Sequence, residues 1–121
     1  MKENNIKNKS FAFAVRVVKL YQYLSEEKRE FILSKQLLRS GTSVGAMVRE
    51  AEHGQSKADF IHKFAIAQKE INETIYWLEL LKATDYINES QFSSLHIEAV
   101  ELMKIITVII KNTKKNLTLN N

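Results

Sequence analysis

Residues 56–81, SKADFIHKFAIAQKEINETIYWLELL, carry the pattern that decides the fold. Ser56 and Asp59 form a capping-box pair, with aspartate in place of the usual glutamate, so a helix begins here. Apolar or small side chains then recur at strict spacings of four and three residues, typical of a helix packed along its neighbour at a shallow angle. The stretch therefore predicts one long helix of a bundle, with its buried stripe at Phe60, Phe64, Ala67, Ile71, Thr74, Leu78 and Leu81.

Two helical patterns precede this stretch. Ser10 is a favourable N-cap for a first helix that reaches about residue 24. Ser25, followed by two glutamates, is the expected N-cap of a second helix over residues 26–52. Gly54 then fits a left-handed cap at the end of that second helix.

A last helical pattern follows the stretch. Asn88, with Gln91 three residues later, predicts a start near residue 88, and the apolar period is lost after Lys111. Four amphipathic helices joined by short turns predict an all-α, antiparallel up-down-up-down four-helix bundle over residues 10–111. Residues 1–9 and 112–121 are expected to be flexible basic tails.

Composition narrows the class of protein. The 121 residues contain no proline and only three glycines, as a helical domain would. The absence of cysteine excludes a disulfide scaffold and a cysteine nucleophile, and it fits the reducing conditions of a cytoplasmic protein. The longest apolar run, residues 105–110, is far short of the roughly 20 residues that span a bilayer. The net charge of +4 is concentrated at the two chain ends and in residues 11–49, whereas residues 50–101 are acidic.

Two features predict self-association. Gly41 and Gly45 lie four residues apart inside the second helix, where each costs about 1 kcal/mol relative to alanine, so a close neighbour from the same or another subunit is expected. The last two helices also carry apolar side chains outside their main stripes. These are Ile66, Trp77, Leu80, Val100, Met103 and Ile110. A second apolar strip indicates an oligomer, and a single wide core is the alternative.

The sequence offers little for catalysis. Glu50-x-x-His53 and Asp59-x-x-His62 resemble the metal motifs of di-iron bundles, but His53 lies beside a turn and no matching inward glutamate is found in the first helix. No phosphate-binding glycine loop and no base beside a nucleophile can be identified. We expect a protein without catalytic residues, metal or cofactor.

Nucleic-acid binding is the function that the basic residues favour. The candidates are Arg16, Lys19, Lys35, Arg39, Arg49, Lys111, Lys114 and Lys115. Tyrosine and tryptophan side chains, Trp77 among them, could stack bases. The alternative is that the arginines pair with Glu50 or Glu52.

Two segments resemble the signature of a known family. They are QLLRSGTSVGA at residues 36–46, followed by REA at 49–51, and SKADFIHK at 56–63, followed by YWLELL at 76–81. They are similar to the four-helix bundle proteins named for reading frames in 23S ribosomal RNA intervening sequences. The resemblance covers roughly residues 10–110. Met47 stands where the family commonly has asparagine.

The resemblance implies a ring-like homopentamer with a central channel. It also relates the chain to the accessory variability determinants of diversity-generating retroelements, which bind a reverse transcriptase and nucleic acid through a basic surface. Residues matching the motif or the apolar surplus are expected at the subunit contact. They are Arg39, Ser40, Gly41, Ser43, Gly45, Glu50 and Trp77.

The predicted function is thus that of a non-enzymatic, oligomeric binding or scaffold module that engages RNA or a ribonucleoprotein. The alternative is a protein adaptor ring that presents acidic residues such as Glu70, Glu73 and Glu79 to a basic partner, for instance a reverse transcriptase, without touching nucleic acid. Neither alternative places the protein at a membrane.

Overall fold

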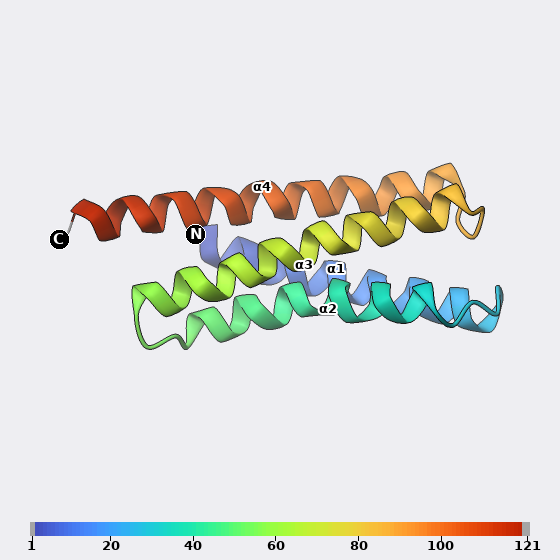
Figure 1. The fold of residues 1–121 in the computed structure, drawn as a ribbon, viewed down its shortest axis with the longest axis horizontal. Helices are drawn as coiled ribbons and strands as arrows, with labels where there is room; N and C mark the ends of the chain where they lie inside the picture. Colours follow the sequence, from blue (N-terminus) through green and yellow to red (C-terminus); the bar gives the residue numbers. More distant parts are fainter. Residues whose placement is uncertain (1, 120–121) are drawn as a thin grey trace.

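The structure, a computed structural model, describes residues 2–119 and consists of four long helices (Figure 1). Helix α1 spans Lys2–Glu26, α2 Leu33–Glu52, α3 Lys57–Ala83 and α4 Glu89–Leu119, and the described residues contain no strand. Each helix packs against the next, and α4 returns to pack against α1. The start of α1, the α2–α3 turn and the last turns of α4 lie at one end of the molecule. The predicted all-α, up-down-up-down bundle is confirmed.

The core consists of the predicted apolar stripes. On α3 the stripe is buried from Phe64 to Leu81, and Phe60 at its first turn is half-buried. Thr74 interrupts this stripe with a hydroxyl that lies 2.9 Å from the hydroxyl of Ser40 on α2, and it also donates to the Glu70 carbonyl. Among the described residues no buried side-chain nitrogen or oxygen lacks a hydrogen-bond partner. The core is therefore apolar, and the few polar side chains buried with it are satisfied.

Helix α1 begins at Lys2, so the prediction that it starts at Ser10 is wrong. Ser10 is buried in mid-helix, where its small side chain lies close to the backbone of Gly45 on α2. The hydroxyl of Ser10 bonds back to the Lys7 carbonyl, as serine does inside helices. Residues 2–9 and 112–119 continue α1 and α4 as helices, which differs from the predicted flexible tails; residues 1, 120 and 121 lie outside the described residues.

Helix α2 begins at Leu33, not at residue 26. Ser25 stays inside α1 and donates to the Tyr21 carbonyl, and residues 27–32 form the connection. The buried carboxylate of Glu30 accepts hydrogen bonds from the backbone N–H groups of Ile32, Leu33 and Ser34, at 3.1, 2.9 and 2.7 Å. The side chain of a glutamate that precedes the helix therefore satisfies the free N–H groups at its start, as an N-cap residue would.

The predicted N-caps at Ser56 and Asn88 are confirmed. Ser56 Oγ accepts from the Asp59 N–H at 3.0 Å, and Asn88 and Gln91 exchange side-chain to backbone hydrogen bonds of 2.8 and 2.9 Å. The prediction of a left-handed Gly54 is wrong, since no glycine among the described residues has a positive φ. Gly54 lies in a crowded position instead, since a Cβ there would lie 3.0 Å from the Asp59 carboxylate and 3.1 Å from the Ala51 carbonyl oxygen.

Gly41 and Gly45 allow α1 to approach α2. A Cβ on Gly41 would lie 2.8 Å from both γ-carbons of Val17, and a Cβ on Gly45 would lie 3.4 Å from the Ser10 carbonyl oxygen. The close neighbour expected for these glycines is therefore a helix of the same chain.

Candidate functional site

Two of the basic residues predicted to bind nucleic acid form ion pairs within the chain. Arg16 on α1 donates to Glu98 and, at 2.7 Å, to Ser94 on α4. Arg39 on α2 donates to Glu70 at 2.8 Å and to Glu73, both on α3. Arg16 and Arg39 thus join neighbouring helices, and their charges are already balanced.

The Arg39 cluster also includes two of the three acidic residues that the adaptor alternative names, Glu70 and Glu73, while the third, Glu79, stays exposed. Glu70 is buried, and hydrogen bonds from Trp77 and then Arg39 lower the pKa of the Glu73 carboxyl. The Trp77 indole N–H donates to Glu73 at 3.0 Å, and the Tyr76 ring packs edge-on against the indole. Glu70 and Glu73 therefore form ion pairs between α2 and α3, and their charges are already balanced within the chain.

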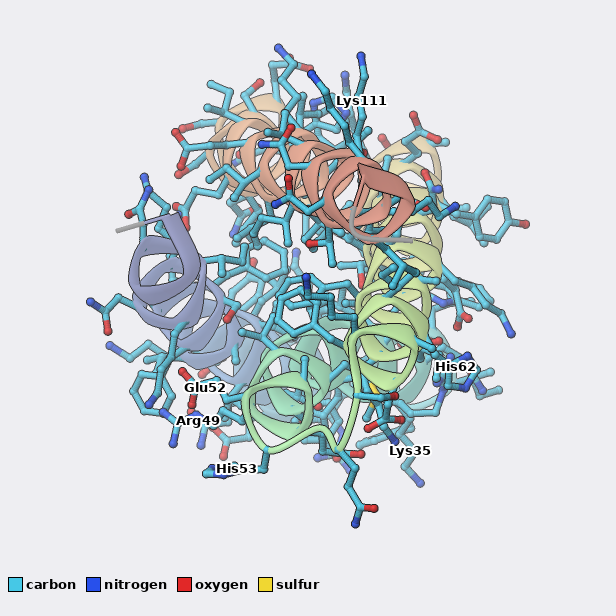
Figure 2. All side chains as sticks on the ribbon, turned by 90° about the vertical axis from the view of Figure 1, so that its left-hand side faces the viewer. Lys35, Arg49, Glu52, His53, His62 and Lys111 are labelled. Carbon is cyan, nitrogen blue, oxygen red and sulfur yellow. The ribbon has the colours of Figure 1, made fainter. Side chains whose placement is uncertain are left out.

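The remaining basic candidates fall into two groups. Lys19 and Lys35 are exposed near the α1–α2 turn, while Arg49 and the α4 lysines Lys111, Lys114 and Lys115 lie toward the other end. Viewed along the bundle from that other end, Arg49 lies at one edge next to Glu52 and His53, and Lys111 projects from α4 at the opposite edge (Figure 2). The structure does not bring all the predicted residues onto one face.

The charge is instead divided along the axis of the bundle. We call the half that contains the α2–α3 turn the basic end; it comprises residues 2–13, 43–69 and 105–119. It carries ten basic and four acidic residues, whereas the other half carries eight basic and ten acidic residues. Two of the four acids at the basic end, Glu50 and Glu52, pair with Lys63 at 3.0 Å and Lys7 at 3.2 Å. The basic end therefore combines a surplus of basic residues with two carboxylates that are paired within the chain.

Two hollows flank the α2–α3 turn at the basic end. One, of about 760 Å³, opens between the end of α2 and the start of α3 and is lined by Arg49, Glu50, His53, Gln55, Ser56, Asp59 and Lys63. The other, of about 390 Å³, opens toward the last turns of α4, and Thr113 and Asn116 line it together with Gln55, Lys57 and Phe60. Sequence reasoning missed Gln55, Lys57 and Asn116 because nothing in the sequence indicated that α4 reaches the turn.

Three of the four residues of the two possible metal motifs, Glu50, His53 and Asp59, line the larger hollow, but the motifs do not form a metal-binding cluster among the described residues. His53 and His62 project in different directions from the two sides of the turn (Figure 2). Within residues that the structure describes, no three histidine, aspartate or glutamate side chains lie where they could share a metal ion. Glu50 of the first motif is the partner of Lys63.

Most of the predicted subunit-contact residues serve the packing of their own chain. Ser40, Gly41 and Gly45 are buried inside the bundle, so assigning them to a contact between subunits is a wrong prediction for this structure. Arg39 and Glu50 are held in ion pairs with α3. Ser43 and Trp77 are half-buried and stay candidates, and Met47, at the position of the family's usual asparagine, packs against the core.

The fold and its charged end define the chain as a small antiparallel four-helix bundle protein. More particularly, the chain belongs to the 23S rRNA-intervening sequence protein family, which matches residues 2–108. The predicted family membership is thereby confirmed.

One solved structure is similar over nearly its whole length. It is a protein of unknown function from the S23 ribosomal protein family of Bacteroides thetaiotaomicron, 56% identical in sequence, with a TM-score of 0.91 over 92% of this chain and 99% of that one. No curated protein matches the chain. None of the helices, as far as the structure describes them, combines the length and hydropathy needed to cross a membrane.

Proposed function

We propose that the protein is a non-enzymatic, oligomeric binding module that engages RNA through its basic end. The observation that carries this proposal is the division of charge along the bundle, with ten basic against four acidic residues at one end. Phosphate contacts supply most of the affinity of sequence-independent nucleic-acid binding. A surface with surplus cations is suited to that role.

Four cations at the basic end are available for phosphate. Among the described residues, no carboxylate lies within ion-pair distance of Arg49, Lys57, Lys111 or Lys115. All four side chains are exposed, and Arg49 lies over the ring of Phe11, 5.3 Å from its centroid. Binding phosphate here breaks no internal ion pair, whereas recruiting Arg16 or Arg39 would.

Changing Lys57, Lys111 and Lys115 together to alanine is expected to weaken binding of a single-stranded RNA and to flatten its salt dependence. Each lost phosphate contact lowers the slope of log affinity against log salt by about 0.7, so the triple variant loses about 2. A filter-binding titration from low to physiological salt measures this slope.

The matched control changes Lys19, Lys28 and Lys35, three exposed lysines at the opposite end, to alanine. This control removes the same charge and is expected to keep most of the slope. Equal losses in both variants would mean that the basic end is not the site. If the unmodified protein ignores RNA even at low salt, the proposed function is wrong.

Self-association is supported by apolar side chains that the single chain leaves exposed. Phe11, Val15 and Val18 follow one another along the outer face of α1, and Phe11 is 56% exposed. Ile97 and Val108 on α4 are exposed as well. Contiguous apolar surface of this kind is typical of subunit interfaces.

Light scattering coupled to size exclusion is expected to give a mass of about 70 kDa, because the family resemblance implies five chains of 14.0 kDa each. Changing Val15 and Val18 to serine is expected to lower this mass while the helix content stays the same. A 14.0 kDa species of the unmodified protein at micromolar concentration would contradict the oligomer.

A further inference from the structure

We propose that the hollow between the α2–α3 turn and α4 is a nucleobase site that accepts one unpaired base of a single-stranded RNA. The inference rests on the proposed RNA-binding function and deepens it, since it names the part of the RNA that is recognised and the residues that recognise it. We call this hollow of about 390 Å³ the base site; its polar and aromatic lining comprises Gln55, Ser56, Lys57, Phe60, Thr113 and Asn116.

Phe60 provides a surface on which a base can stack. Phe60 is half-buried and lines the hollow, and its ring packs on that of Phe64 in the core, with the centroids 4.7 Å apart at an interplanar angle of 40°. Phe64 itself is only 2% exposed, so the support is rigid. Stacking on such a fixed aromatic ring is the usual way in which proteins hold unpaired bases.

Amide and hydroxyl groups surround this ring. Gln55 and Asn116 are exposed, and each amide offers both hydrogen-bond donors and an acceptor to the edge of a base. The Thr113 hydroxyl donates to the Ile109 carbonyl at 2.7 Å, which leaves its oxygen free to accept. An unpaired base exposes donors and acceptors of both kinds, so this lining matches it better than it matches an apolar side chain of a protein partner.

One phosphate-binding cation lies at the rim of the base site. Lys57 lines the hollow from α3, whereas Lys111 and Lys115 lie near Thr113 and Asn116 along α4 but on a different face of that helix. Glu52, which also lines the hollow, is paired with Lys7 and so repels phosphate less than a free carboxylate would. The base and its flanking phosphates therefore meet complementary groups.

The tight α2–α3 turn determines where the base site lies. A Cβ at Gly54 would lie 3.0 Å from the Asp59 carboxylate and 3.5 Å from the Phe60 backbone nitrogen, so the end of α2 lies close to the first turn of α3. The extension of α4 to Leu119 then places Thr113 and Asn116 beside this turn. If α4 ended at Lys111, only the α2–α3 turn and the helix ends beside it would line the base site.

The experiment compares two labelled probes of equal length and charge, a short oligouridylate and the corresponding abasic ribose-phosphate strand, by fluorescence anisotropy. The unmodified protein is expected to bind the oligouridylate about tenfold more tightly. Phe60→Leu, which keeps an apolar side chain, should lose this preference while its affinity for the abasic strand and its salt slope stay unchanged. Asn116→Ala, an exposed position, should reduce the preference several-fold.

Phe92→Leu is the matched control, because Phe92 is a half-buried aromatic side chain near the opposite end of the bundle. It should leave both affinities unchanged. Should Phe60→Leu fail to fold by circular dichroism, Asn116→Ala alone decides the question.

The outcomes separate the two proposals. Oligouridylate preference that survives both Phe60→Leu and Asn116→Ala, or no preference in the unmodified protein, would overturn the base site and leave RNA binding in place. If neither strand binds at low salt, both the base site and the proposed function are overturned.

Discussion

Gly41→Leu is expected to lower the free energy of unfolding by about 3 kcal/mol, because overpacking a filled interior typically costs 1–3 kcal/mol and leucine adds four carbons here. Even a single Cβ at this position would lie 2.8 Å from both γ-carbons of Val17, a β-branched side chain with little freedom to move away. To admit leucine, α1 must separate from α2. Urea denaturation followed by circular dichroism measures the loss.

Two variants test this explanation. At Gly45 the nearest atoms to an added Cβ lie at 3.4 and 3.5 Å, so Gly45→Ala is expected to be neutral or to stabilise by up to about 1 kcal/mol through helix propensity. Val17→Ala combined with Gly41→Leu should cost less than the sum of the two single changes, because the γ-carbons that clash are gone. If Gly41→Leu leaves the free energy of unfolding unchanged but dissociates the oligomer, then Gly41 lies at the contact between subunits and the overpacking explanation is wrong.

Glu30→Gln is expected to lower the free energy of unfolding by about 2 kcal/mol, since hydrogen bonds to a charged group contribute roughly 1.5–3 kcal/mol and three backbone N–H groups depend on this carboxylate. The amide keeps one acceptor oxygen, loses the negative charge near the start of α2, and leaves at least one N–H unsatisfied. Glu27→Gln, an exposed change in the same loop, should have no measurable effect.

The same carboxylate makes stability depend on pH. Burial raises the pKa of Glu30, but the hydrogen bonds from Leu33, Ser34 and Ile32 outweigh it, so its pKa is lowered in the folded state. Its contribution is therefore complete above the unfolded pKa of about 4.3 and is lost as the pH falls through the lower folded value. Unfolding titrations between about pH 6 and pH 3 should show a smaller decline in Glu30→Gln than in the unmodified protein. Identical declines would contradict this role.

The sequence predicts those parts of the fold that depend on neighbouring residues. The caps at Ser56 and Asn88 and the stripe of α3 are correct because each needs only side chains three or four positions away. Ser10 and Ser25 show the same cap-like pattern, yet both lie within α1. Ser10 lies inside the helix because it packs against Gly45 of α2, and a local sequence pattern contains no information on such a distant neighbour.

The candidate site was harder to predict for the same reason. The surplus of basic residues is visible in the sequence, but their pairing depends on which helix faces which, so Arg16 and Arg39 were counted among the free cations although α4 and α3 neutralise them. The sequence pattern identifies Phe60 only as the first residue of a core stripe. Its second role depends on the walls that the α2–α3 turn and α4 provide.

The return of α4 to α1 has a consequence for the order of events during protein synthesis. Helices α1, α2 and α3 can pack on one another as they leave the ribosome, because each contacts its immediate successor. The contacts between α1 and α4, such as Lys9 with Glu101, join residues some ninety positions apart and form only when the last helix has emerged. Until then Ile106 and the rest of the apolar stripe of α4 are missing, and the nascent chain exposes an open groove that its own final segment must fill.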